Sequence, residues 1–285
     1  MSAERAMGLF AGVELSRRVD RAEQVMLEEA AAAATRRDPA LSVLVQPIGG
    51  GLGVWAGPGA PFDKVIGVGL GGDFDDAELD ALEQAYDERD APVQFEVSTL
   101  ADPAVVTRLT RRGYTLVGFE NVLGLPLAPG RQAERADGVE IAEVGPAEFQ
   151  TWVNVMVDGF AAPDTQGVMS HEEFPRDVLA NAEHDMAAIS GFVATMATVD
   201  GVPAGVGAIR LADGLAQLCG AATLPRFRRR GVQYSLLSTR LAAAAAAGCD
   251  LAVVTTLPGS KSQQNVQNLG FQLLYARAVL VRAAE

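Results

Sequence analysis

The sequence predicts an α/β (α+β) protein built from two similar domains. Short β-branched or apolar runs alternate with longer helical patterns along the whole 285-residue chain, which is typical of domains that pack helices on sheets. A chain of this length fits two ordinary domains. The order of elements in the first part also returns in the second part, which indicates a duplicated fold.

The N-terminal part begins with good helix formers from Leu9 to Arg37, which predict one or two helices ending before Asp38-Pro39. Gly and Pro residues then separate short apolar runs in a strand-turn-strand pattern. The remaining predicted elements of this part are strands at 41–46, 52–56 and 64–70, a helix at 75–90, a strand at 93–99, a helix at 103–112 and a strand at 114–125.

A polar stretch rich in Pro and Gly, residues 126–138, predicts an interdomain linker. We place the boundary near residue 133, so that the two domains cover residues 1–133 and 134–285. Beyond the linker, Asp200-Gly201 and Asp213-Gly214 are turn residues of tight hairpins and predict an antiparallel meander. The predicted C-terminal elements are a strand at 139–144, helices at 146–160 and 172–183, strands at 191–199, 203–211 and 215–223, a helix at 232–247, a strand at 251–256, a helix at 262–269 and a strand at 271–282.

The two parts repeat each other at a constant offset of 157 in residue number, which we call the repeat shift. It places 97–100 (Val-Ser-Thr-Leu) on 254–257 (Val-Thr-Thr-Leu) without a gap. It also places Gly113-Tyr114 on Gly270-Phe271, and the helix at 75–90 on the helix at 232–247. Matches of small apolar residues arise easily by chance, but the agreement in element order and spacing favours duplication.

Composition and charge exclude several classes of protein. The chain holds 36 acidic and 23 basic residues, a net charge of −13, and 20 of the acidic residues lie within residues 1–130. Such a surface repels nucleic acids and anionic membranes. Without an apolar run long enough to span a bilayer or a signal-peptide pattern, we expect a cytoplasmic protein. Two cysteines and two histidines give no metal-ligand cluster, so we expect no metal.

The most informative stretch lies between a predicted strand and a predicted helix, at residues 222–233. Four arginines occur within five positions, at 226 and 228–230, and Gly231 follows them directly. A loop entering a helix N-terminus exposes unpaired N–H groups, and glycine allows a ligand to approach the backbone closely. Phosphate is the natural ligand of such a site. The alternative is a solvated basic patch in which Gly231 only starts the helix.

From Arg228 to Gln233 the sequence (RRRGVQ) resembles the [Q/R]-x-x-G-x-[G/A] signature of the GNAT superfamily of acyl-CoA-dependent N-acyltransferases. Gln233 departs from the final small residue of that signature. The stretch 262–271 (SQQNVQNLGF) resembles the following helix of the family with its terminal Gly-Phe. The resemblance covers about residues 139–282 well, and residues 41–127 only as a degenerate half-copy. It implies two GNAT-like domains, each with a mixed, mainly antiparallel sheet flanked by helices.

The resemblance also implies a cofactor site for acetyl-CoA. Backbone amides in the loop would hold the pyrophosphate, a three-residue stretch of the preceding strand would pair with the pantetheine arm, and two residues of the later helix would contact the rest of the cofactor. The acyl group would lie where the strands ending at Thr223 and Thr256 splay apart. The residues so assigned are Arg228, Arg229, Arg230, Gly231, Val232 and Gln233 in the loop, Ala221, Ala222 and Thr223 in the strand, and Ser262 and Asn265 in the helix.

Catalytic residues are less clearly indicated. The general acid frequent in the family is a Tyr five residues before the Phe of Gly-Phe, a position that Val266 occupies here. Tyr275, Tyr234 or a water molecule would have to substitute, or catalysis is weak or absent. The candidates for a general base are Asp164, His171, Glu172 and Glu173. The last three equally fit a helix N-terminus capped by Ser170, with acids in its first turn. Cys219 reads as a small core residue.

In the N-terminal copy, the repeat shift places residues 71–76 (GGDFDD) on the arginine-rich loop. Carboxylates at Asp73, Asp75 and Asp76 would satisfy the amides of that helix and repel a pyrophosphate. We therefore expect no coenzyme A in this copy. The same residues also fit an ordinary helix N-terminus, which leads to the same negative expectation.

These observations lead to a tandem GNAT-like N-acetyltransferase that moves an acetyl group from acetyl-CoA to a primary amine by direct attack. The acceptor would be a small molecule or a peptide, with a slight preference for cationic amines, and a homodimer is compatible with the sequence. Two alternatives stay open. One is a non-catalytic acyl-CoA sensor or interaction module, and the other is an acidic scaffold whose arginine loop meets an anionic protein.

Overall fold

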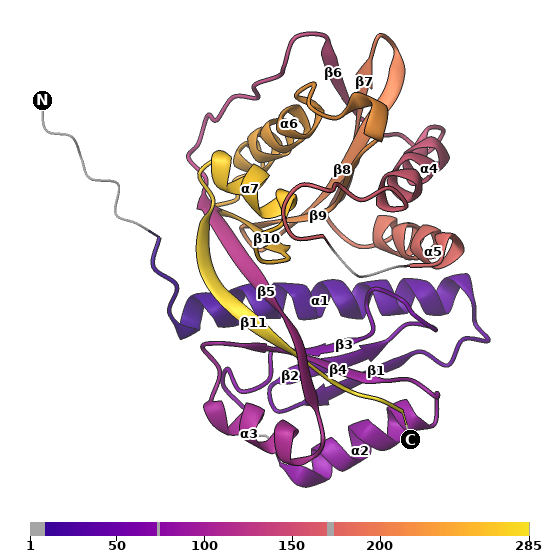
Figure 1. Cartoon of the computed structure of the whole chain (residues 1–285), viewed down its shortest axis with the longest axis vertical. Helices are drawn as coiled ribbons and strands as arrows, with labels where there is room; N and C mark the ends of the chain where they lie inside the picture. Colours follow the sequence, from indigo (N-terminus) through magenta and orange to yellow (C-terminus); the bar gives the residue numbers. More distant parts are fainter. Residues whose placement is uncertain (1–8, 73–74, 170–173, 285) are drawn as a thin grey trace, which may run out of the picture.

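The structure of the chain is a computed structural model that describes residues 9–72, 75–169 and 174–284. Its two halves are stacked along the long axis of the molecule, and α1 lies across the middle between them (Figure 1). The helices are α1 (Val13–Arg37), α2 (Asp76–Asp87), α3 (Pro103–Arg111), α4 (Phe149–Phe160), α5 (Arg176–Ala187), the short 3₁₀ turn η1 (Pro225–Phe227), α6 (Val232–Ala246) and α7 (Lys261–Asn268). The strands are β1 (Leu44–Ile48), β2 (Gly51–Trp55), β3 (Lys64–Ile66), β4 (Val93–Ser98), β5 (Thr115–Pro126), β6 (Val139–Glu143), β7 (Phe192–Val199), β8 (Val202–Ala212), β9 (Leu215–Thr223), β10 (Leu251–Thr256) and β11 (Gln272–Arg282).

These strands form a single mixed sheet in the order β1-β2-β3-β4-β11-β5-β10-β9-β8-β7-β6. Most neighbours are antiparallel, and the two parallel pairs are β3 with β4 and β9 with β10. The predicted meander is confirmed, because β7, β8 and β9 pair antiparallel in sequence. Asp200 and Asp213 have φ values of 53° and 50° and are followed by glycines with positive φ, as tight hairpin turns require. The predicted α/β class with a mainly antiparallel sheet is therefore confirmed.

The last strand of each half is exchanged with the other half. β11, from the end of the chain, lies between β4 and β5, and β5 lies between β11 and β10. Both long strands run through the centre of the molecule (Figure 1). We still propose residues 1–133 and 134–285 as the two domains. They are separate in sequence, but each half of the sheet is completed by a strand from the other half.

The sequence repeat is visible in the structure. Among the helices, the repeat shift places α2 on α6 and α3 on α7. Among the strands, it places β4 on β10 and β5 on β11. In each case the bounds agree within one or two residues. Glu120 and Arg277 are equivalent under this shift and pair directly across β5 and β11. A pseudo-twofold axis therefore passes through this pair of residues and relates the two halves.

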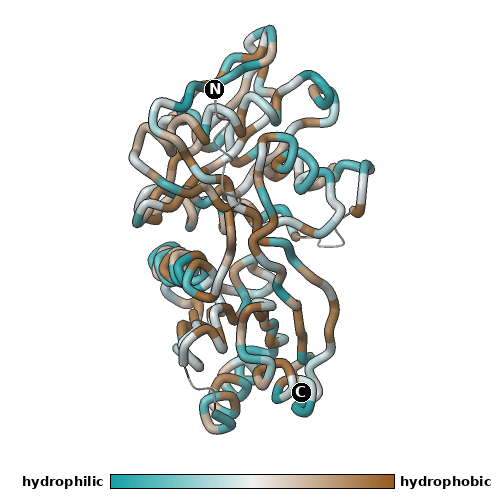
Figure 2. The backbone as a smooth tube through the Cα atoms, turned by 90° about the vertical axis from the view of Figure 1, so that its left-hand side faces the viewer, coloured by the Kyte–Doolittle hydropathy of each residue, from teal (hydrophilic) through white to brown (hydrophobic). Residues whose placement is uncertain are grey.

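Apolar side chains fill the space between the sheet and the helices on both faces. α2 and α3 cover one face of the N-terminal half, and α6 and α7 cover the corresponding face of the C-terminal half. α4 and α5 pack on the opposite face, where α1 also lies against both halves. Figure 2 shows the hydrophobic segments concentrated in the interior of each half and the hydrophilic segments at the outer loops.

A cluster of buried charges occupies the centre, close to the pseudo-twofold axis. The guanidinium of Arg277 lies 2.7 Å from carboxylate oxygens of Asp20 and Glu23 and 3.3 Å from Glu96. The ammonium of Lys64 lies 3.2 Å from both Glu23 and Glu96. Buried charges are tolerated only when paired in this way, so the cluster ties α1 to strands from both halves.

Several predicted boundaries differ from the structure by three or four residues, and the start of α5 is one of them. The sequence pattern placed a helix at 172–183, with Ser170 as its cap, whereas α5 begins at Arg176. Pro175 is the reason, because proline suits the first turn of a helix and disfavours helical geometry in the residue before it. α5 then continues to Ala187, since Met186 still belongs to its buried face.

Candidate active site

The strands β9 and β10 diverge in the C-terminal half. Their parallel pairing joins Leu251, Ala252 and Val253 to residues 215–217 and stops there. Beyond that point β9 pairs only with β8, and β10 pairs only with β5. One edge of residues 218–223 is thus open toward β10, as a V-shaped opening in the sheet requires. Ala221, Ala222 and Thr223 lie on this stretch of β9.

Two hydroxyl groups at the ends of the diverging strands have no hydrogen-bond partner within the described part of the chain. They belong to Thr223 on β9 and Thr256 on β10, and both oxygens are buried. A buried polar atom without a partner is costly, and a ligand is one explanation for it. The open edge of β9 also offers backbone groups with which a chain that carries amides, such as pantetheine, can hydrogen bond.

The loop after β9 exposes backbone amides at the start of α6. Arg229 and Gly231 both adopt left-handed backbone conformations, with φ values of 61° and 76°. Alternating backbone handedness of this kind turns successive N–H groups toward one side and forms an anion-binding concavity. Gly231 is the N-cap of α6, and no side chain caps this helix. The first amides of the helix therefore stay available to an anion.

Three of the four arginine side chains of this loop have structural partners. Arg228 donates to the carbonyl oxygens of Ala162 and Pro163 and to that of Thr223. Arg226 and Arg230 lie over the ring of Phe227, and Arg230 is also 3.7 Å from Asp200. The groups of this loop best placed for an anion are thus its backbone amides, while Arg228 connects the loop to the segment that follows α4.

The two residues expected on the later helix share one face of α7. Ser262 is exposed and Asn265 is half-buried, and Val266 beside them packs into the core under α6. Val266 packs against apolar residues of α6, so the neighbouring positions Ser262 and Asn265 lie near that helix. Val266 is only 2% exposed, and it offers no proton donor at the position where the family often has tyrosine.

Tyr275 lies elsewhere. Its hydroxyl donates to the carboxylate of Asp20 at 2.7 Å, in the cluster of buried charges under α1. Burial and the neighbouring Asp20 raise the pKa of Tyr275 further above its ordinary value. This position gives the proposed acid role no support. Tyr234 is exposed and donates to Glu134 of the linker.

Most of the predicted bases cannot be placed. His171, Glu172 and Glu173 lie outside the described residues. The carboxylate of Asp164 accepts a hydrogen bond from the amide of Gln166, as in an ordinary turn. Burial raises the pKa of Cys219 to about 12, so its thiol stays protonated and is no nucleophile. The predicted loop therefore yields no base with a demonstrated position in the cleft.

Sequence reasoning missed Glu183 of α5. A Cβ placed on Gly220 would lie 3.4 Å and 3.7 Å from the two carboxylate oxygens of Glu183, so the carboxyl group touches β9 where the strand bulges. The bulge follows from the register, in which Gly207 pairs with Ala221 and Ala208 with Cys219. It lies directly beyond the paired segment of β9, where the strands begin to diverge.

Glu183 is buried and makes no hydrogen bond or ion pair with the described residues, and this burial raises its pKa to about 7. A carboxylate with such a pKa is well matched to accept a proton near neutral pH. The sequence did carry a signal for this residue. Glu183 lies on the apolar face of its helix, four residues after Leu179 and three before Met186, where a core residue is expected.

The described part of the N-terminal half lacks these features. Asp75 caps α2 by accepting a hydrogen bond from the amide of Glu78 at 2.7 Å, whereas α6 has no such cap. Asp73 lies outside the described residues. β3 and β4 pair at Val65 and Phe95, which correspond to residues 222 and 252 on the diverging strands of the other half. A paired sheet thus occupies the place of the opening, consistent with the expectation that this half binds no coenzyme A.

The sequence profile of the acetyltransferase (GNAT) family matches residues 157–271, the segment that holds the diverging strands, the exposed amides and Glu183. Residues 157–271 form a GNAT domain. The matched segment runs from α4 to the start of β11. A search of curated proteins finds no match to the chain.

Solved structures extend the likeness in fold to both halves. A GCN5-related N-acetyltransferase from Kribbella flavida aligns with a TM-score of 0.61 at 22% identity, over 90% of this chain and 96% of that one. A tandem GNAT protein from the clavulanic acid biosynthesis pathway aligns with a TM-score of 0.54 at 14% identity, over 73% of this chain and 69% of that one. Over both halves the chain therefore shares its fold with these two GNAT proteins.

Two further findings concern the described ranges. None of the helices in them is long and apolar enough to cross a lipid bilayer. No group of three or more His, Cys, Asp or Glu side chains in these ranges is placed to hold a metal ion.

Proposed function

We propose that the protein is an N-acetyltransferase that uses acetyl-CoA as donor and a primary amine as acceptor, and that the C-terminal half alone carries the site. The observation that supports it most is the contrast between equivalent helices. α6 starts with uncapped amides beside an open strand edge, while α2 is capped by Asp75 beside a closed sheet. The GNAT profile covers the same C-terminal segment.

Within this proposal the chain contributes binding, positioning and proton transfer. The amides of residues 229–233 hold the pyrophosphate, and the open edge at Ala221, Ala222 and Thr223 aligns the pantetheine arm. Ser262 and Asn265 contact the remainder of the cofactor from α7. When bound, acetyl-CoA supplies a thioester that an amine can attack directly.

Glu183 is the base in this account. A primary amine with a pKa near 10.4 is mostly protonated at neutral pH, so a group that takes up its proton is needed before attack. The carboxylate of Glu183 accepts this proton at the bulge of β9. With Val266 at the usual acid position, the proton for the departing thiolate comes from protonated Glu183 or from water.

The cofactor site is tested by making α6 resemble α2. Gln233 and Asp76 are equivalent under the repeat shift, and both lie in the first turn of their helices. Gln233→Asp adds a carboxylate where the pyrophosphate would bind. It leaves the fold intact, since an acidic residue stabilises a helix N-terminus by about 0.3 to 1 kcal/mol. We expect acetyl-CoA affinity to fall at least tenfold in a calorimetric titration.

The matched control is Asp76→Gln, which makes the reciprocal change in the N-terminal half and should leave acetyl-CoA affinity unchanged. Equal affinities of wild type and Gln233→Asp would remove the cofactor site from α6. A loss of acetyl-CoA affinity in Asp76→Gln would place the cofactor site in the N-terminal half and contradict the proposal.

A second candidate is a non-catalytic acyl-CoA sensor, which the buried Val266 favours. Release of free thiol separates the two functions. A protein that binds acetyl-CoA but releases no coenzyme A with any primary amine at pH 8, where Glu183 is deprotonated, is a sensor.

A further inference from the structure

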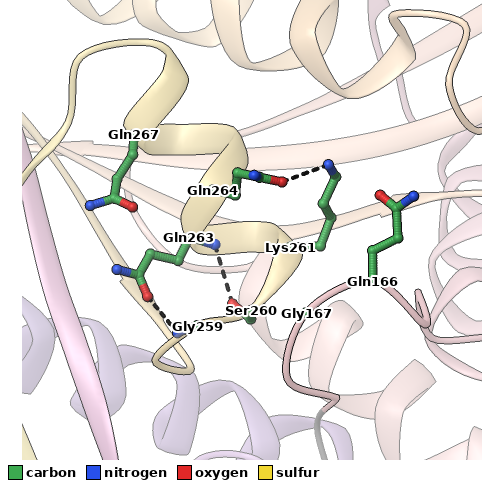
Figure 3. Close-up of a pocket in the computed structure, with 8 residues that line it drawn as sticks. All are labelled: Gln166, Gly167, Gly259, Ser260, Lys261, Gln263, Gln264 and Gln267. Carbon is green, nitrogen blue, oxygen red and sulfur yellow. Dashed lines mark hydrogen bonds between the residues drawn. The ribbon is translucent and has the colours of Figure 1, made fainter.

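A second opening lies beside the proposed cofactor site, on the other face of α7. It is a cavity of about 330 Å³ between the start of α7 and the segment that follows α4 (Figure 3). Its lining consists of Gln166 and Gly167 from that segment, and Gly259, Ser260, Lys261, Gln263, Gln264 and Gln267 from α7 and the turn before it.

Among the residues that the structure describes, the lining is rich in primary amides and contains no carboxylate. Figure 3 shows Lys261 donating from its ammonium to the carbonyl oxygen of Gln264, at 2.8 Å. The side-chain carbonyl of Gln263 accepts from the amide of Gly259 at 2.7 Å. These bonds occupy two of the four glutamine oxygens and leave the amide N–H groups and two ammonium N–H groups, so the cavity offers more hydrogen-bond donors than acceptors.

One side of the cavity belongs to residues 162–168, a segment that we call the strap. The cavity lies at the end of the diverging strands. Near its start, Arg228 of the cofactor loop donates to the carbonyl oxygens of Ala162 and Pro163. At its end, the amide of Val168 donates to the carbonyl of Gly259 at 3.0 Å, and Gly167 bridges to Ser260. The strap thus spans from the end of β9 to the turn after β10, and the cavity lies along it.

The cavity is separate from the face of α7 that we assign to the cofactor. Residues 260, 264, 263 and 267 follow a spacing of three and four and share one side of the helix. Ser262 and Asn265 lie on the other side of the helix, next to Val266, which packs in the core with residues of α6. A group bound in the cavity would therefore reach the diverging strands from the side opposite the cofactor.

The duplicated half has a cavity at the equivalent place, with different chemistry. It measures about 480 Å³, and its lining includes Asp102, Pro103, Val106, Thr107 and Thr110. The repeat shift carries these five positions onto 259, 260, 263, 264 and 267, all of which line the first cavity. Apolar and hydroxyl side chains thus stand where the C-terminal half has glutamines. The amides are specific to the half that carries the GNAT domain.

We infer that the amide-lined cavity binds the body of the acceptor amine, and that this body is uncharged and carries hydroxyl or carbonyl oxygens, as in an amino sugar or an amino-acid amide. This inference rests on the proposed function. Amide and ammonium donors recognise such oxygens, and Lys261 repels a second positive charge. The cavity therefore favours these amines over the polyamines that the acidic surface suggests.

The test uses Gln264→Leu/Gln267→Leu, with Thr107→Leu/Thr110→Leu as the matched control at the equivalent positions of the other half. Binding of glucosamine, glycinamide and spermidine to the full-length protein without cofactor is measured by ligand-detected NMR. We expect glucosamine or glycinamide to bind the wild type and the control, and to bind the glutamine variant about tenfold or more weakly, from the loss of two hydrogen-bonding groups. Spermidine binds more weakly than either.

Separate acetyl-CoA titrations distinguish this inference from the proposed function. If the wild type does not bind acetyl-CoA, the proposed acetyltransferase function is refuted. The NMR experiment then still decides whether the cavity binds glucosamine or glycinamide. A glutamine variant that binds acetyl-CoA more weakly but glucosamine and glycinamide unchanged would assign the cavity to the cofactor. Preference for spermidine, or no difference between the two double variants, would also overturn the inference.

Discussion

Replacement of Glu183 by glutamine should separate the activity of this protein from its stability. The substitution keeps the shape of the side chain and removes its ability to take up a proton. Positioned general bases typically contribute 10²- to 10⁴-fold to a rate, so we expect kcat/KM for acetyl transfer to fall by about that factor. In the wild type, kcat/KM should rise with pH and level off above pH 7, because the pKa of Glu183 is about 7 and its deprotonated form is active.

The same substitution should stabilise the fold at alkaline pH. Burial raises the pKa of Glu183 from 4.5 to about 7. The folded protein therefore holds this proton more tightly than the unfolded chain, and stability falls as pH rises from about 4.5 to about 7. This difference in pKa between the folded and unfolded states corresponds to roughly 3 kcal/mol at alkaline pH. Glutamine regains only part of that free energy, because its own amide is polar and is buried without a hydrogen-bond partner. Urea unfolding at pH 8 should thus show Glu183→Gln to be more stable by about 1 to 3 kcal/mol.

Asp185→Asn on the same helix is the control, because it should change the free energy of unfolding in the opposite direction. Asp185 pairs with Arg37 of α1 through contacts of 3.0 and 2.9 Å, so its loss should destabilise the fold by about 1.5 to 3 kcal/mol and leave the pH profile of activity unchanged. Full activity of Glu183→Gln, or an unchanged apparent pKa in its pH profile, would refute the role of Glu183. Destabilisation of Glu183→Gln at pH 8 would refute the reasoning about its burial.

Two further predictions concern the centre of the molecule. Arg277→Met should lower the free energy of unfolding by about 3 to 5 kcal/mol, because Asp20, Glu23 and Glu96 lose their buried partner. Arg176→Met, which breaks an exposed pair with Asp158, should change it by less than about 1 kcal/mol, and equal losses in urea melts would contradict the account. Residues 1–133 expressed alone lack β11 between β4 and β5, so they should not unfold cooperatively, whereas a mixture with residues 134–285 should. Cooperative unfolding of residues 1–133 by themselves would show that the exchanged strand is dispensable.

The sequence predicted the elements because their signals are local. Asp200-Gly201 and Asp213-Gly214 specify hairpin turns through their own backbone preferences, and each turn has the positive φ values expected of it. The repeat shift was readable because equivalent helices and strands begin at nearly constant offsets along the chain. Gly231 was readable in the same way, since an uncapped helix start after a positive φ depends on a few neighbouring residues.

Features that depend on tertiary pairing could not be read in this way. β5 and β11 are equivalent strands, and nothing in either sequence states that each pairs within the sheet of the other half. Glu183 was missed because the role that we propose for it depends on the bulge at Gly220, which packing brings next to it. Tyr275 looked available as an acid in sequence, whereas the fold commits its hydroxyl to Asp20 of α1, near the opposite end of the chain.

A calorimetric titration of the full-length wild type with acetyl-CoA tests the central claim most directly, because it reports both affinity and stoichiometry. The account predicts one molecule bound per chain, at the exposed amides of α6, with none at α2, where Asp75 caps the helix. No binding, or two molecules per chain, would contradict it.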